Sequence, residues 1–415
     1  MRPLGLYLGF SRPGGGAPVV TTFGALTQEG AGGVPVSGSS IASGDASNHF
    51  AIASGRIAPT AAGVAAGLSG SPYVMTTNSG QSVTITVEAD TYSVRDATEL
   101  VAAVTAAGAS KTVKARPVNF GTTIALASLT KTGLTITQEA GGQFGLTTLS
   151  AVTGVTFSGV KWAYDSTTLY SSGASSANKC IVFVSNGSNV AFSSSCEIDG
   201  TSALGKLYRR EGLRVESEGA SCTVSYTGGS IHHVRTPVKY NGSAGGTVAL
   251  DGTALHHFVE QGIQGDNHDL NCNALDIYAP EGDSGKRFFW SAQSGSFTVG
   301  EILTNGLTGT SKKIIQVVAV GANYVDGYYN NYAKPVAAEV YTGASGNFTV
   351  DTLTTDFDGV HGDGIQPLNN NATANRNVTI TNCLIGRDTP YDFDALGEQP
   401  MQGIFIEDAN ATYGW

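Results

Sequence analysis

One nine-position pattern recurs along this chain and limits what the chain can fold into. It places apolar residues or threonine at its first, third, sixth and eighth positions, as expected for a short strand, a bend and a second short strand. Period-two alternation in such short pieces means that one face of each strand is buried. Because the unit recurs, each copy needs neighbours to complete its core, and the pattern predicts a solenoid. The copies are 155–162, 248–255, 270–277, 297–304, 348–355 and 378–385.

A third short apolar strand lies ahead of or between these pairs, mostly at steps of about 25 residues, a length that three strands and three turns account for. The sequence therefore predicts an all-β fold, a right-handed single-stranded parallel β-helix. An antiparallel sandwich or barrel is the alternative, since short strands with Gly and Asn turns also suit those folds. Scarce two-residue hairpin signals favour the parallel fold. The third strands begin near Ile181, Leu213, Val238, Ile263, Phe288, Ile315, Val336, Ile365 and Ile404.

Three segments are expected along the chain. Residues 1–33 are too interrupted by Arg, Pro and Gly for a secretory or membrane segment, and we expect an N-terminal arm that docks onto another protein or is unstructured. Residues 34–93 have a different apolar spacing and are predicted to form a small β module, whose turn and strand spacing resembles cadherin-like linker modules. Residues 94–415 are predicted to form the β-helix.

A short helix is predicted just before the first coil. Asp96 and Glu99 have the spacing of a helix start, Leu100 and Val104 supply an apolar face, and Gly108 can end the helix. Such a helix would cap the open end of the solenoid. With this helix, the strand at 112–115 and coils of the type NVTITN at 377–382, the chain from 94 to 415 resembles the pectate-lyase-like β-helix group.

Charge and histidine are predicted to gather along one edge of the solenoid. Five of the seven histidines lie in segments expected to be loops between the last strand of one coil and the first strand of the next. The neighbouring strand adds an outward stripe of polar, charged and aromatic side chains, which suits an extended oligosaccharide; a solvated outer face is the alternative. The predicted substrate-binding residues are Arg214, Lys239, His232, His256, Gln264, Asp266, Glu281, Asp283, Arg287, Phe289 and Gln366.

The densest cluster of reactive side chains is the Gly-rich segment 356–366. Glycoside hydrolysis needs a carboxylic acid and a second carboxylate. Elimination from a uronic acid needs a base and a group that neutralises the sugar carboxylate. The segment resembles the HGDGIQ-type loop of several β-helix carbohydrate-active and phage receptor-binding proteins, although Asp and His could instead fix a tight loop by hydrogen bonds. The predicted catalytic residues are Asp356, Asp358, His361 and Asp363.

Two groups of side chains are candidates for metal binding. The expected stacking of His232 on His256, and of His233 on His257, supplies imidazoles, but two histidines do not complete a zinc shell. The carboxylates of segment 356–363 suit Ca²⁺ better, although no EF-hand or RTX-type repeat is present. We predict no metal ligand and no cofactor, with Ca²⁺ as the alternative.

The net charge of −10, from 33 acidic and 23 basic residues, disfavours nucleic acid and gives no basic face for a membrane. A rod with an N-terminal arm and no visible export signal resembles a bacteriophage tail fibre or tailspike. The resemblance implies a homotrimer in the virion tail, attached to a virion or tail protein through the arm and binding host surface glycan through the solenoid. The alternatives are a free, secreted polysaccharide lyase or glycoside hydrolase and a non-catalytic adhesin at the cell surface. Whether the protein is an enzyme stays open.

Overall fold

The computed structural model divides the chain into two compact units, Met1–Val118 with Gly133–Gly141, and Asn119–Thr132 with Gly142–Trp415. No helix among the described residues is long and apolar enough to cross a membrane. The described residues are 16–26, 33–66, 72–116, 119–121, 123–166, 174–200, 208, 210–280, 285–308, 311–329, 335–353, 363–369, 377–386, 403–404 and 407–408.

The first unit contains a small β module with two sheets. One has the order β1-β7-β6-β3 and the other the order β2-β5-β4. The core includes Phe23 and Phe50, whose ring centroids are 6.5 Å apart. β1 belongs to the segment predicted as an arm, and its partner β7 is far along the chain, so no hairpin signal marks it. The elements are β1 (Val19–Gly24), β2 (Val34–Pro35), β3 (Ile41–Ser43), β4 (Phe50–Ala53), β5 (Arg56–Pro59), α1 (Ala61–Ala65), β6 (Tyr73–Thr77) and β7 (Ser82–Glu88).

The predicted helix is present as α2 (Ala97–Ala106). The Asp96 carboxylate accepts a hydrogen bond from the Glu99 backbone N–H at 2.8 Å, and this bond satisfies a donor at the helix start. Leu100 is buried on the side that meets β8 (Thr91–Val94) and β9 (Thr112–Ala115). These strands are parallel, and β9 also pairs with the end of β11 (Ile124–Gln138). A capping role for α2 remains a prediction.

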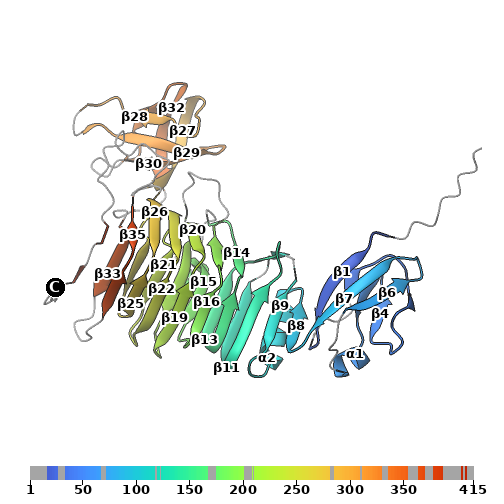
Figure 1. Ribbon diagram of the computed structural model, residues 1–415. Helices are drawn as coiled ribbons and strands as arrows, with labels where there is room; N and C mark the ends of the chain where they lie inside the picture. Colours follow the sequence, from blue (N-terminus) through green and yellow to red (C-terminus); the bar gives the residue numbers. More distant parts are fainter. Residues whose placement is uncertain are drawn as a thin grey trace, which may run out of the picture. The chain divides into compact units, whose positions relative to one another are not determined.

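The second unit is built mainly from parallel strands that repeat three to a coil, and Figure 1 shows successive coils side by side. One sheet has the order β10-β12-β14-β17-β20-β23-β26-β35. Its strands are β10 (Asn119–Phe120), β12 (Gln143–Phe144), β14 (Lys161–Ala163), β17 (Glu197–Asp199), β20 (Ser230–Val234), β23 (Ala254–Phe258), β26 (Asp276–Pro280) and β35 (Leu384–Ile385).

The other parallel sheet carries the first two strands of each coil. Within the second unit its order is β34-β25-β22-β19-β16-β13-β15-β18-β21-β24-β33-β36, and it turns through the bent strand β13. The all-β class and the long parallel sheets are as predicted, and the arrangement is compatible with a β-helix-like fold. The strands are β13 (Thr147–Ser158), β15 (Cys180–Ser185), β16 (Val190–Ser193), β18 (Glu211–Glu216), β19 (Cys222–Thr227), β21 (Val238–Asn241), β22 (Gly246–Asp251), β24 (Ile263–Asp266), β25 (Asp269–Asn273), β33 (Ile365–Asn369), β34 (Val378–Thr381) and β36 (Glu407–Asp408).

Aromatic side chains in register form the core of the coils. Phe157, Phe192 and Tyr226 occupy equivalent positions on β13, β16 and β19. Their rings stack with centroids 5.4 and 5.5 Å apart, and all three are fully buried. The Trp162 ring packs against Phe192 at 5.6 Å and donates its indole N–H to the Thr147 hydroxyl at 2.9 Å. Parallel register therefore aligns these aromatic side chains in one buried column along successive coils.

Residues 285–353 differ from the prediction. They form a closed barrel of antiparallel strands inserted between β26 and β33, whereas the nine-position pattern predicted parallel coils there. The coils continue across the insertion, because β24 pairs directly with β33 and β26 with β35. The hairpin signal was missed because residues 321–323 and 343–345 are three-residue connections. The barrel strands are β27 (Gly285–Gly295), β28 (Ile302–Thr304), β29 (Ile314–Val320), β30 (Tyr324–Tyr329), β31 (Val340–Thr342) and β32 (Gly346–Leu353).

Candidate functional site

The strands β17, β20, β23 and β26 carry a row of chemically active side chains at one register position. Asp199 pairs with His232, His232 with His256, and His256 with Tyr278. The His232 and His256 rings stack with centroids 4.6 Å apart, and the His256 and Tyr278 rings stack at 4.9 Å. With the adjacent His233 and His257, these residues define the histidine ladder: Asp199, His232, His233, His256, His257 and Tyr278.

The histidines lie on strands, although the sequence placed them in loops. His233 and His257 have φ values of 55° and 51°, in the left-handed region. His232 and Val234 pair with His256 and Phe258 of the next coil without a register shift, and the His233 ring lies beside that of His257 at 5.0 Å. The left-handed backbone at His233 brings the Nδ1 atoms of His232 and His233 to 2.8 Å from each other. His256 and His257 repeat the arrangement one coil later, at 2.6 Å.

Burial keeps His256 uncharged. Burial first, and then the neighbouring imidazoles led by His232, together lower the pKa of His256 to about 3, against a smaller raising effect of the Asp199 carboxylate. A neutral imidazole has one donor and one acceptor nitrogen. At neutral pH His256 therefore offers hydrogen bonds rather than positive charge.

The end of the ladder at Asp199 is ionic. The Lys161 ammonium lies 3.1 Å from the Glu197 carboxylate and 3.3 Å from that of Asp199. The hydrogen bond from His232 to Glu197, 3.0 Å long, lowers the pKa of Glu197, and Lys161 lowers it further against the effect of burial. Burial alone would lower the pKa of Lys161, but the hydrogen bond and charge of Glu197 outweigh it, and the pKa is raised. A protonated amine thus lies between two carboxylates beside a histidine.

Four of the predicted stripe residues share one register on the other sheet. Arg214, Lys239, Gln264 and Gln366 follow one another on β18, β21, β24 and β33, and the Gln264 amide donates to the Gln366 side-chain oxygen at 3.0 Å. This row is more covered than expected, since Arg214 and Gln366 are buried. Asp266 ends β24, and its carbonyl oxygen is 3.1 Å from the His268 Nδ1 atom.

Arg214 is engaged within the protein. Its guanidinium bonds the carboxylates of Glu216 at 2.7 Å and Glu211 at 2.9 Å. Burial acts to lower the pKa of Arg214, but the charge and hydrogen bond of Glu211 raise it by more. Lys239 is 3.5 Å from the same Glu211 carboxylate. The Arg214 pairs lie within β18, and the contact of Lys239 with Glu211 joins β18 to β21.

Two further predicted residues belong to the barrel and not to the stripe. Arg287 and Phe289 lie on β27, because residues 285–353 pair antiparallel instead of adding coils. The Arg287 guanidinium bonds Asp326 through two nitrogens, at 2.7 and 2.8 Å, and lies over the Tyr324 ring at 3.7 Å. The Phe289 ring packs edge-on against the same Tyr324 ring at 5.9 Å.

The predicted catalytic segment is described only at its end. Asp363 is fully buried, and its carbonyl oxygen accepts a hydrogen bond from the Gly262 N–H at 2.9 Å. The other predicted residues of this group, together with two predicted binding residues, lie outside the described residues: Asp356, Asp358, His361, Glu281 and Asp283.

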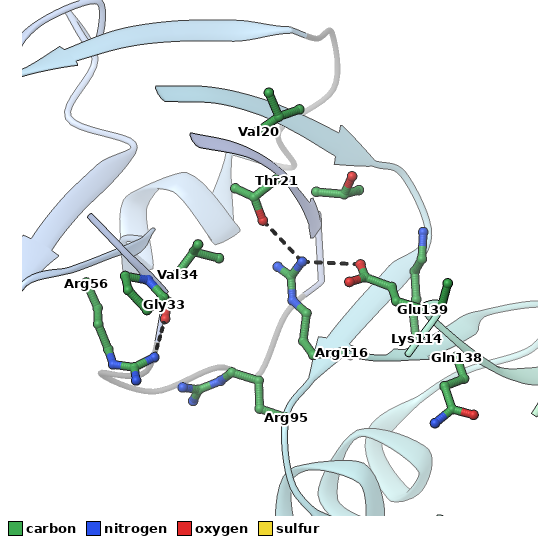
Figure 2. Close-up of a pocket in the computed structure, with 13 residues that line it drawn as sticks. Val20, Thr21, Gly33, Val34, Arg56, Arg95, Lys114, Arg116, Gln138 and Glu139 are labelled. Atoms are coloured by element: carbon green, nitrogen blue, oxygen red, sulfur yellow. Dashed lines mark hydrogen bonds and ion pairs between the residues drawn. The ribbon is translucent and has the colours of Figure 1, made fainter. Parts of the chain in front are cut away.

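Figure 2 shows a different polar site, a pocket of about 690 Å³ in the first unit. Its cationic side chains already have partners, which leaves little charge to attract an anion. It contains no histidine, and its one carboxylate, Glu139, is bound by Arg116. We therefore base the functional argument on the ladder. The pairs are Arg56 with the Gly33 carbonyl at 3.0 Å, Arg95 with Glu99 at 2.7 Å, Lys114 with Glu88 at 2.7 Å and Arg116 with Glu139 at 3.3 Å.

Sequence reasoning missed Lys161, Glu197, Asp199 and Tyr278 as site residues. Lys161 begins β14 and Glu197 begins β17, and each directly precedes a buried residue of its strand. This is an outward position of period-two alternation. Aligning the coils on those buried residues would have placed all four beside the histidines.

The chain matches no protein-family model, no curated protein and no solved structure. Arguments about its function therefore rest on its own geometry.

Proposed function

We propose that the protein binds an extended surface polysaccharide along the histidine ladder, as the receptor-binding rod of a bacteriophage tailspike or tail fibre. In this proposal the stacked coils form a right-handed single-stranded parallel β-helix with α2 as its cap. The observation that carries it is the ladder: side chains of one polar kind repeat at the spacing of adjacent strands, about 4.8 Å. A repeating row of hydrogen-bonding groups suits a repeating chain of hydroxyls.

The geometry specifies how the ladder would hold a sugar. The His256 ring lies between the His232 and Tyr278 rings, whose planes are within 14° of its own, so that both of its faces are covered. A sugar therefore meets the edge of the His256 ring, and recognition there is by hydrogen bonding more than by stacking. The neutral state of His256 supports this mode, because it provides a donor and an acceptor without charge.

A second candidate function, cleavage of the bound chain, is favoured by the carboxylates and imidazoles that meet at the ionic end of the ladder, where Glu197 bonds His232 and Asp199 lies beside His233.

Binding is tested with a panel of purified capsular polysaccharides and lipopolysaccharides, including uronate-containing and neutral chains, by isothermal titration calorimetry with the full chain. The variant His256→Ala should weaken binding to the recognised polymer about 2- to 10-fold, since it removes a neutral hydrogen-bonding group worth about 0.5–1.5 kcal/mol. His49→Ala, in the first unit, is the matched control and should bind normally. Binding to no polysaccharide, or unchanged binding by His256→Ala, overturns the proposal.

Cleavage is measured separately, as new reducing ends or as the ultraviolet absorbance of unsaturated uronates. Binding without either signal identifies a non-catalytic receptor-binding protein.

A further inference from the structure

Three possible metal-ligand atoms, from Asp199, His232 and His233, form a compact triangle at the Asp199 end of the ladder. The Nδ1 atoms of His232 and His233 are 2.8 Å apart, and the Asp199 Oδ1 atom is 3.4 Å from the first and 3.1 Å from the second. Donors bound to one zinc ion at about 2.0–2.1 Å are about 2.9–3.4 Å apart for bond angles between about 90° and 110°. The triangle therefore has the dimensions of three sites around one metal ion.

We propose that Asp199, His232 and His233 bind a divalent transition-metal ion, with Zn²⁺ as the best match to two imidazole nitrogens and one carboxylate oxygen. All three belong to the set of side chains whose ligand atoms lie within 4.8 Å of one another. Imidazole ligands select Zn²⁺, Co²⁺, Ni²⁺ or Cu²⁺ over Ca²⁺ and Mg²⁺, which prefer oxygen. This inference does not depend on the proposed binding of polysaccharide.

The backbone is shaped to point both imidazoles at one spot. Consecutive side chains of a regular strand lie on opposite faces. The left-handed φ of 55° at His233 breaks this alternation. The neighbouring coil approaches this backbone closely, since a Cβ at Gly200 would lie 1.7 Å from the His233 carbonyl oxygen. The Ser166 hydroxyl donates to the same oxygen at 2.5 Å, and the Tyr208 ring packs edge-on against the His233 ring at 5.8 Å.

A carboxylate outside the triangle orients one of the ligands. The His232 Nε2 atom is 3.0 Å from the Glu197 carboxylate. With Nε2–H donating to that carboxylate, Nδ1 presents its lone pair to the triangle. Histidines that bind metals commonly donate their other N–H to a carboxylate in this way.

The charge balance favours a cation at this position. Asp199 and Glu197 contribute two negative charges and Lys161 one positive charge, and Lys161 lies 3.3 Å from the Oδ2 atom of Asp199, whereas the Oδ1 atom lies 3.1 Å from His233. The His233 and Asp199 side chains are 19 % and 16 % exposed, which leaves an approach for a fourth ligand, water or a hydroxyl of a bound molecule.

The next coil provides an internal control. His256 and His257 have the same left-handed backbone and the same close Nδ1 atoms, but His232 occupies the register position on the preceding strand that corresponds to Asp199. This pair lacks the carboxylate of the triangle, and among the described residues only the first pair belongs to a set of three metal-ligand side chains. One ion per chain is therefore expected.

The test uses the full chain, stripped with EDTA, dialysed and titrated with Zn²⁺ in a calorimeter, and with Co²⁺ under a visible spectrometer. Wild type should bind one Zn²⁺ per chain, and Co²⁺ should give the absorption bands of a four-coordinate site. Asp199→Asn and His233→Asn should each weaken Zn²⁺ at least about 100-fold; Glu197→Gln should weaken it about 10-fold or more, the range for an outer partner. His233→Asn is chosen because Asn tolerates the left-handed backbone, so that the fold is retained.

His257→Asn, at the same left-handed backbone, and His49→Ala are the matched controls and should bind Zn²⁺ as wild type does. Excess Ca²⁺ should not displace Co²⁺ from the wild-type site. No Zn²⁺ binding by wild type, or an unchanged Co²⁺ spectrum in folded Asp199→Asn and His233→Asn, overturns the proposal. Titrating polysaccharide in EDTA tests the proposed function independently, so that either proposal can fail without the other.

Discussion

The parallel coils and the antiparallel barrel carry the same nine-position pattern and use it differently. In the coil copy 248–255, Val248, Leu250 and Leu255 are all buried. In the barrel copy 297–304, Phe297 is buried but Val299 is 61 % exposed and Ile302 is 37 % exposed. Alternation therefore identifies strands in both regions, but it predicts the buried face in the coil copy 248–255 and not in the barrel copy 297–304.

The difference lies in the partner of each strand. A coil strand pairs with the equivalent strand of the next coil, even across the insertion, where Ile263 of β24 lies beside Ile365 of β33. A barrel strand pairs with neighbours in the same insertion, and its ring closes through β27 and β32. Period-two alternation is a property of one strand and contains no information about its partner.

The largest expected effect is a loss of free energy of unfolding that is confined to either the coils or the barrel. Phe192→Ala removes a ring from the aromatic column of the coils, and we expect the free energy of unfolding of the coils to fall by about 3–5 kcal/mol. Phe348→Ala removes a buried ring from the barrel and should destabilise the barrel by a similar amount. Urea unfolding followed by hydrogen exchange assigns each loss to a region. Loss of protection in both regions from either variant would show that the two cores unfold as one.

Buried ion pairs should show a smaller difference of the same kind. Arg214→Ala leaves the carboxylates of Glu211 and Glu216 buried without their shared cation, and we expect a loss of about 3 kcal/mol from the coils. Arg287→Ala in the barrel leaves one carboxylate, Asp326, without its cation and should have about half that effect. Thermal unfolding at constant pH measures both. An equal or larger effect in the barrel would contradict the greater role assigned to the coil network.

The repeat, the helix and the row of stripe residues were predictable because each depends on local pattern and on register. Asp96 and Glu99 mark α2, and coil spacing places Arg214, Lys239 and Gln264 in one row. The insertion was not predictable, because three-residue connections give no strong hairpin signal and because its strands alternate as the coil strands do.

The meeting of the two adjacent imidazoles was also beyond the sequence. In a regular strand His232 and His233 would lie on opposite faces, and only the left-handed backbone at His233 brings them together. Glycine or asparagine would have signalled such a conformation, whereas histidine does so weakly. The sequence therefore identified the histidines and their stacking but could not predict the triangle with Asp199.

The response to pH should distinguish the regions further. The pKa of His256 is about 3 when folded and near 6.5 when unfolded, so that the unfolded chain binds the proton first as pH falls. This contribution to stability is present above about pH 6.5 and is lost progressively towards pH 3. Between pH 7 and pH 5 the coils should lose about 1–2 kcal/mol, allowing for partial exposure.

The barrel segment 285–353 contains no histidine and is the matched control for this pH effect. Its free energy of unfolding should change little over the same range. His256→Gln should remove most of the difference between the regions. Equal pH dependence in both regions, or an unchanged dependence in His256→Gln, would contradict the burial of a neutral imidazole.

The smallest expected effect concerns which region meets the polysaccharide. Tyr278→Phe removes one hydroxyl from the ladder, and the loss of one neutral hydrogen bond should weaken binding about 2- to 10-fold, because such a bond is worth about 0.5–1.5 kcal/mol. Tyr324→Phe makes the same change on the barrel, where the ring lies under Arg287 and beside Phe289, and should leave affinity unchanged. Calorimetry with one defined oligosaccharide compares the two variants with wild type. The reverse result would move recognition from the parallel coils to the inserted barrel, and the ladder would then be a device for joining coils.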